Sequence, residues 1–153
     1  MTMTSANRHD PRIIPAPPAV ETLQPLRRAL LDLHRALLEG ERAEVEKERG
    51  DRLQAGDLLQ ALLHDPRWAW LRPLGGLVAG IDEAVFLAGK GEVTVGEPEL
   101  RAYAAETRRL VGGESPILGD RYLELVQLLP DVTVAVGAVR RALDEVDARS
   151  LVG

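Results

Sequence analysis

The sequence predicts an all-α fold, a single-domain bundle of five or six helices preceded by a disordered Pro-rich tail. We place the tail at residues 1–18 and the helical bundle domain at residues 19–151. Apolar residues recur three and four positions apart along most of the chain, and glycine or proline separates the successive segments. The chain has 153 residues, of which 45% are hydrophobic, and this length suits one domain with its own core.

A long helix is predicted from about residue 22 to residue 48. Proline is tolerated only in the first turn of a helix, so Pro25 places the start near Thr22. After Gly40 the segment ERAEVEKERG is almost entirely charged, which is typical of a solvated helix end. Five leucines at spacings of three and four residues form one apolar line, here called the leucine seam: Leu23, Leu26, Leu30, Leu33 and Leu37.

A shorter helix is predicted over about residues 54–64. Asp65 then provides a capping side chain, and Pro66 fits the first position of a new helix. Only about two turns follow before Pro73, which removes a backbone donor and clashes with the preceding turn. We therefore expect a break just before Pro73 and a third helix that reaches about Leu87.

Small residues on this third helix would allow a neighbouring helix to approach closely. Gly76 and Gly80 are four positions apart, so they lie on the same side of the helix. Because glycine has no side chain, a second helix could approach closely there.

Three more helices complete the predicted bundle. The segment VTVAV alternates as a strand would, but its valines also fit a helical spacing that continues through Leu143 and Val146. We therefore favour a helix there. The three ranges are about 98–111, 117–129 and 131–148.

Composition excludes several classes of function. Without cysteine the chain has no disulfide, thiolate metal site or cysteine nucleophile, which fits a reducing cytoplasm. Its net charge of −5 disfavours non-specific binding to nucleic acid or anionic membranes. The N-terminal segment has no apolar run of a secretory signal, and the longest apolar stretch, residues 74–88, is too short to span a bilayer. We expect a cytoplasmic protein without a nucleic-acid or membrane partner.

No catalytic residue, metal ligand or cofactor is predicted. None of the three histidines, His9, His34 and His64, follows a glutamate by three positions, and no two of them are four apart. The glycines around Lys90 lack the rest of a phosphate-binding loop. His34 lies beside the apolar face of the first helix and is interpreted as a histidine at the edge of the core. An enzyme is therefore the least favoured class.

Both tryptophans lie in one short stretch, LLHDPRWAWLRPLGGLVAGIDEAV. Two positions apart in a helical turn, Trp68 and Trp70 point about 200° apart. We expect one of them to fill the corner between the second and third helices and the other to cover a neighbouring helix or a partner. Asp82, if buried, needs a basic partner, for which Arg67 and Arg72 are the candidates.

This stretch resembles a segment of small, uncharacterised bacterial all-helical proteins. The similarity covers residues 28–85 and centres on HDPRWAWLRPL. It implies a bacterial origin, and it brings no activity, cofactor or site residue with it.

Two classes of function remain open from the sequence. The first is a non-enzymatic bundle that self-associates, most simply as a symmetric homodimer, or binds a protein partner. Its support is that the first and last helices carry more apolar surface than a single neighbour covers. Alternatively, these two helices pack on each other within one chain. The second class is a small-molecule-binding regulator whose cavity is lined by five residues: Trp68, Trp70, Arg72, Asp82 and Tyr103.

Overall fold

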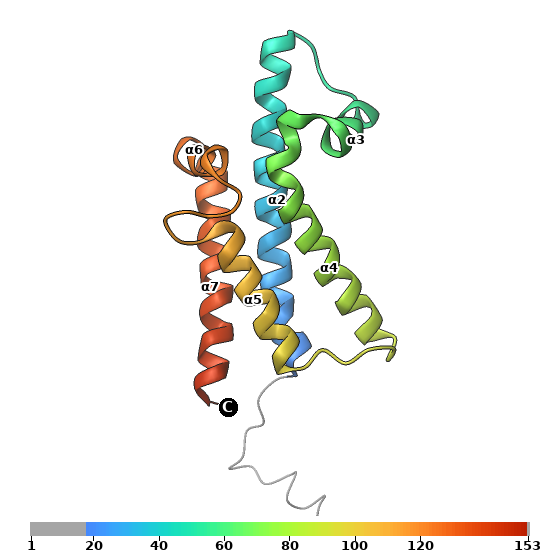
Figure 1. Ribbon diagram of the computed structural model, residues 1–153, viewed down its shortest axis with the longest axis vertical. Coiled ribbons are helices and arrows are strands. Elements are labelled where there is room, and N and C mark those ends of the chain that lie inside the picture. Colours follow the sequence, from blue (N-terminus) through green and yellow to red (C-terminus); the bar gives the residue numbers. More distant parts are fainter. Residues whose placement is uncertain (1–17, 153) are drawn as a thin grey trace, which may run out of the picture.

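The computed structural model describes residues 18–152, and the regular secondary structure of this part of the chain is helical, with no strand (Figure 1). The predicted all-α bundle is confirmed. The tail expected at residues 1–18 lies, except for Pro18, outside the described residues. Six α-helices and one 3₁₀ helix follow in order: α2 (Ala19–Arg49), α3 (Ala55–His64), η1 (Pro66–Leu71), α4 (Arg72–Gly89), α5 (Glu97–Val111), α6 (Asp120–Leu128) and α7 (Pro130–Val152).

Helices α2 and α7 run antiparallel and form the most extensive interhelical contact (Figure 1). The register is set at one end by Arg149, whose guanidinium donates to the Thr22 hydroxyl at 3.4 Å. At the other end the Leu129 side chain packs directly on Gly40, where a Cβ would lie 2.5 Å from its Cδ1 atom and would force that side chain to shift. Between these points Ala29 and Ala36 of α2 lie across from alanines of α7, so the two helices pack closely.

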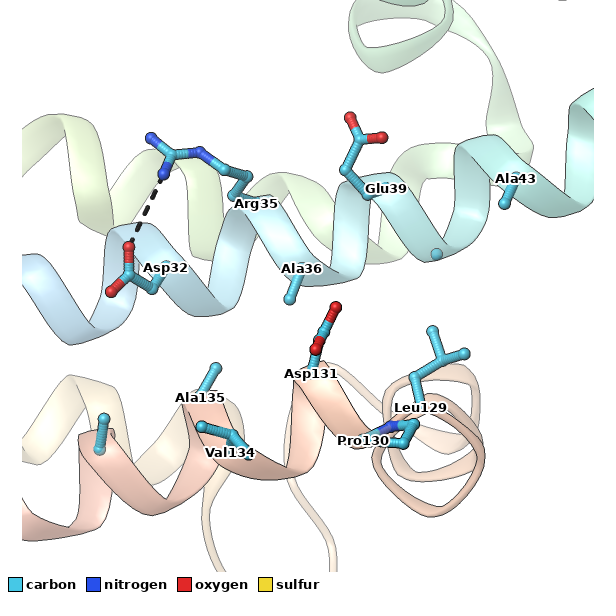
Figure 2. A pocket seen from close by; sticks show the side chains of 12 residues that line it. Asp32, Arg35, Ala36, Glu39, Ala43, Leu129, Pro130, Asp131, Val134 and Ala135 are labelled. Atoms are coloured by element: carbon cyan, nitrogen blue, oxygen red, sulfur yellow. Dashed lines mark ion pairs between the residues drawn. The ribbon is translucent and has the colours of Figure 1, made fainter.

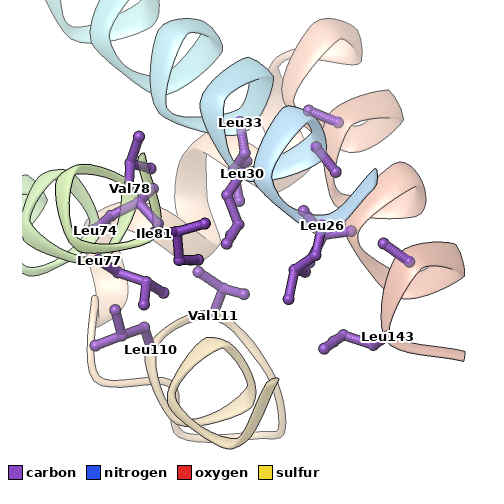
Figure 3. Packing of buried hydrophobic residues seen from close by; sticks show 14 of the residues in the cluster. Leu26, Leu30, Leu33, Leu74, Leu77, Val78, Ile81, Leu110, Val111 and Leu143 are labelled. Carbon is purple, nitrogen blue, oxygen red and sulfur yellow. The ribbon is translucent and has the colours of Figure 1, made fainter. Parts of the chain in front are cut away.

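The leucine seam of α2 is buried within this one chain. Its side chains meet the apolar faces of α4, α5 and α7 in a continuous core (Figure 3). Four valines of α7 are buried in the same way, whereas Val134 is exposed, and the predicted helix through VTVAV is confirmed. The buried positions of α7 include Val132, Val136, Val139, Leu143 and Val146.

Helix α2 starts earlier than Pro25 suggested. It begins at Ala19, and Pro25 lies in its second turn. A proline there removes the hydrogen bond that its own nitrogen would make and crowds the carbonyl four residues earlier, which is a local cost. Burial of Ala19 and Leu23 favours continuing the helix through this region. The expected start near Thr22 was therefore wrong.

Helix α6 begins at Asp120, three residues later than the predicted position. The backbone N–H groups of Ile117 and Leu118 donate to the Arg109 and Leu110 carbonyls in the last turn of α5 at 3.0 Å each, and so cap the end of α5 instead of starting α6. Gly119 then has a φ of 87°, a conformation that favours glycine and interrupts the chain before α6.

No helix makes the close approach that Gly76 and Gly80 would allow. A Cβ at either position would have no atom within 4 Å outside its own helix. The close contact of α4 is at Gly75, where a Cβ would lie 3.3 Å from Nε2 of His34. Both predicted glycines are thus left on an open surface of α4.

None of the helices between residues 18 and 152 has, by itself, the length and apolar content needed to cross a membrane. Only α6 and α7 taken together have that length and apolar content, and the two helices of this pair are bent by 109° relative to each other.

Candidate functional site

The five residues predicted to surround a ligand do not share one cavity. Trp68 and Trp70 lie on η1, and Arg72 begins α4. Asp82 faces α2, while Tyr103 lies on α5 in a groove beside α4. The structure instead brings one tryptophan together with a glutamate that the sequence reading had placed in solvent.

Trp68 fills the corner where α3, η1 and the end of α2 meet. Its side chain is 1% exposed, and it forms the inner wall of a shallow groove beside Val45 and Leu53. The chain can turn here because the Asp65 carboxylate accepts a hydrogen bond from the backbone N–H of Arg67 at 2.9 Å. The predicted cap at Asp65 and the corner position of one tryptophan are both confirmed.

Trp70 points the other way and binds a buried carboxylate. Its Nε1 donates to the Glu41 side chain of α2 at 3.0 Å. The same carboxylate accepts two bonds from the Arg121 guanidinium of α6, at 2.9 and 3.1 Å. Arg67 of η1 lies 3.5 Å away on the remaining side. We call these four side chains the Glu41 cluster.

Arg121 also holds the outer edge of the Glu41 cluster. Its guanidinium donates to Glu44 at 3.1 Å and contacts Glu124 on its own helix. Arg67 likewise pairs with Glu48. The two arginines therefore meet four carboxylates, of which only Glu41 is buried, and they join α2, η1 and α6 at one end of the bundle.

Glu41 stays ionised in this setting. Burial raises the pKa of its carboxyl, but the hydrogen bonds and charge of Arg121, with help from Trp70 and Arg67, lower that pKa further than burial raises it. The net pKa of Glu41 lies below its ordinary value, while that of Arg121 is raised chiefly by its hydrogen bond to Glu41. A carboxylate with every oxygen engaged by donors is a poor proton acceptor.

The Glu41 cluster braces three helices and lies away from the grooves of the surface. Glu41 is 1% exposed, and it lines none of the larger grooves found over residues 18–152. Within that part of the chain no group of three histidine, cysteine or acidic side chains could hold a metal ion. No buried side-chain polar atom described by the structure lacks a hydrogen-bond partner.

Sequence reasoning missed Glu41 because it lies in the charged segment ERAEVEKERG. The reading of that segment as a solvated helix end was wrong at this position and right for most of its neighbours. The available signal was spacing: Glu41 follows Leu37 by four residues and so continues the buried side of α2. A charged residue on that line predicts a buried ion pair.

Asp82 pairs with Arg27 of α2, and neither Arg67 nor Arg72 reaches it. Helices α2 and α4 are antiparallel (Figure 1), so Asp82, in the second half of α4, lies beside Arg27 near the start of α2 and not beside η1. Arg72 instead donates to the backbone carbonyls of Leu62 and Asp65, at 2.7 and 3.0 Å. Both expected partners of Asp82 were wrong, and Arg72 serves to fix the end of α3.

A long shallow groove runs between α2 and α7 on the outer side of their alanine contact (Figure 2). Its volume is about 750 Å³. Ala36 points across it toward Val134 and Ala135, and Val134 is 69% exposed. The rim carries both signs of charge, including an ion pair between Asp32 and Arg35 at 3.8 Å. The groove shows no convergent set of polar groups of the kind that orients a small ligand.

The half-buried His34 supports a pH prediction. Burial lowers its pKa from 6.5, so the folded protein resists protonation that the unfolded chain accepts. Protons therefore favour unfolding, and this stability is present above the unfolded pKa and lost as the pH falls below it. We expect the unfolding free energy to fall between pH about 7 and about 5, and His34→Gln to remove part of that fall.

Urea denaturation at the two pH values measures this effect. An unchanged slope in His34→Gln would show that other groups cause it.

No family model, curated protein or solved structure matches this chain in the three comparisons made.

Proposed function

We propose that this protein is a non-enzymatic helical bundle that self-associates as a symmetric homodimer through α3. The observation that carries the proposal is the exposed leucine face of this helix. None of its ten residues is buried, and Leu59 and Leu63 are each 55% exposed. They are four positions apart and form one apolar strip.

Helix α3 has little support from its own chain. Its main contact is with η1, and it projects from the side of the bundle (Figure 1). Isolated helices shorter than about 12–15 residues are marginal in water, so a helix of this length needs its apolar face covered. Leu58 and Leu62 are half covered by the chain itself, and the other two leucines are available to a partner.

The chemistry of the strip favours a second copy as the partner. A two-fold axis places the same surface opposite itself, so charges on that surface would repel. Asp57 and His64 are the ionisable groups of α3, and both line the groove on the other side of the helix, toward α2. The strip itself carries no charge. One short helix buries less than a standard interface, so we expect a dimer that dissociates on dilution.

The helix faces from which the sequence predicts a dimer are not available to a partner. The leucine seam of α2 and the valines of α7 are covered within one chain, which is the alternative left open by the sequence. The ligand-binding alternative is less favoured, because Trp68, Trp70, Arg72, Asp82 and Tyr103 do not converge. Self-association must therefore use another surface, and α3 offers one.

Light scattering coupled to size exclusion tests the proposal. We expect a mass near twice 16.7 kDa at high micromolar concentration, and a monomer for Leu59→Glu/Leu63→Glu. Because no residue of α3 is buried, this variant should keep its fold, which circular dichroism would verify.

The matched control is Val134→Glu, which places the same charge on an exposed apolar residue of α7. It should remain dimeric. A monomeric wild type would refute the proposal, and loss of the dimer in Val134→Glu alone would assign the interface to the α2–α7 groove.

A further inference from the structure

A second groove lies between α4 and α5, at the other end of the bundle from α3. It has a volume of about 410 Å³ and an apolar floor that includes Leu87, Val95 and Tyr103. Glu83 and Glu99 line it, and no basic side chain does. At Gly80 it continues into a further hollow of about 400 Å³.

We infer that this groove binds the segment Arg12-Ile13-Ile14 of the same chain. The inference is independent of the proposed dimer. Two adjacent isoleucines in a polar, proline-rich segment would gain stability by leaving water. Arg12 beside them carries a positive charge. Glu83 and Glu99 have no basic side chain beside them in the lining of the groove. The apolar floor of the groove thus matches the two isoleucines, and its acidic rim matches the arginine.

Glu83 is available for this contact. It is exposed, and no salt bridge to it is found among residues 18–152. Glu99 accepts the backbone N–H of Gly96 at 2.7 Å, and a carboxylate has further acceptor positions. Both oxygens of one glutamate could receive a guanidinium in the paired geometry that arginine favours.

The groove lies within reach of the segment. Arg149 contacts both Thr22 in the first turn of α2 and Glu97 in the first turn of α5. The α5 side of the groove is therefore next to the point where the chain enters α2. Four residues separate Ile14 from Ala19, and they span up to about 13–14 Å when extended.

The intervening residues favour this extended path. Three of the four, Pro15, Pro17 and Pro18, are prolines, which restrict the chain to extended conformations. Pro18 is the one that the structure describes, and its φ of −53° and ψ of 148° are those of extended polyproline. A restricted linker reduces the entropy lost when the segment binds.

The larger α2–α7 groove is a poorer match for a basic segment. Asp32 on its rim already pairs with Arg35, and Arg28 and Arg141 line its continuation toward the start of α2. Arg12 would meet arginines as well as the carboxylates of Glu39 and Asp131 there, whereas it meets only carboxylates among the charged residues of the α4–α5 groove. Charge therefore favours the smaller groove.

Paramagnetic broadening of NMR signals tests the inference in the full chain. The sequence has no cysteine, so a nitroxide can be attached at Asn7→Cys alone. We expect selective broadening of amides around Glu83–Leu87 and Val93–Glu99, and little at Val134–Ala138. Ile13→Ser/Ile14→Ser should abolish the broadening at the groove.

Gly80 supplies a variant that blocks the site without crowding the core. A Cβ there meets nothing within 4 Å, so Gly80→Phe should fill the groove and preserve or raise the melting temperature. The control is Gly76→Phe, one turn earlier, which lines only the adjoining hollow. Broadening should be lost in the first variant and retained in the second.

Three outcomes would overturn the inference. The first is weak, uniform broadening in the wild type, and the second is broadening centred on the α2–α7 groove. The third is broadening at the groove of isotope-enriched chains that carry no nitroxide, when they are mixed with nitroxide-labelled chains without isotope enrichment, which would assign the segment to a second copy.

Discussion

Replacing Arg121 by methionine should destabilise the protein by about 3–5 kcal/mol, the range seen when one partner of a buried ion pair is removed. The Glu41 side chain is only 2% exposed, whereas that of Arg121 is 23% exposed. Loss of the arginine therefore leaves a carboxylate that water cannot reach and that Trp70 and Arg67 satisfy only in part. Urea denaturation followed by tryptophan fluorescence measures the loss.

The pH dependence distinguishes this cause from simple loss of packing. In the wild type the pKa of Glu41 is lowered, so its contribution to stability is present above the unfolded pKa and lost as the pH falls through the folded one. In Arg121→Met the burial effect remains while the main opposing contact is gone, so the pKa should rise. The destabilisation should then shrink as the pH falls from neutral toward about 5.

A double variant provides the control for the Arg121 prediction. Glu41→Gln/Arg121→Met removes both charges and keeps an oxygen that can accept the Trp70 hydrogen bond. It should recover most of the stability lost in the single variant. A double variant as unstable as Arg121→Met would mean that the unpaired carboxylate is not responsible.

The second large effect is expected at Trp68. Truncation of a fully buried aromatic side chain costs about 3–5 kcal/mol, and Trp68→Ala should fall in this range. Trp68→Phe should lose less, because the smaller ring still fills part of the corner. Trp70 remains as the fluorescent reporter in both variants. A loss below about 1 kcal/mol in Trp68→Ala would show that the corner collapses around the gap or that the side chain is not packed there.

The helices were predictable because local signals mark them. Leucine spacing located α2, the Asp65-Pro66 pair located η1, and Pro73 located the start of α4 to within a residue. The start of α6 was missed because Ile117 and Leu118 bond backward to α5, a contact that no local pattern reveals. The start of α2 was predicted too late because proline is expected only in the first turn of a helix. Here the burial of Ala19 and Leu23 outweighs the cost of Pro25 in the second turn.

The candidate site was less predictable because it depends on long-range placement. Glu41 and Arg121 are 80 residues apart, and nothing near either residue identifies the other. Asp82 was matched to the wrong arginines because a linear sequence does not state which turn of α2 lies beside which turn of α4. Gly76 and Gly80 showed that small residues permit a close contact without producing one.

The pairing of α2 with α7 also bears on how the chain reaches its native state. The contact between Thr22 and Arg149 closes a loop of 127 residues, whereas α4 and α5 meet across a short connection. Closing long loops costs entropy before any contact compensates for it, and proteins rich in such distant contacts fold more slowly. On the ribosome α2 emerges well before its principal partner. Its leucines must therefore be shielded by α4 and α5, or by a chaperone, until α7 has been synthesised.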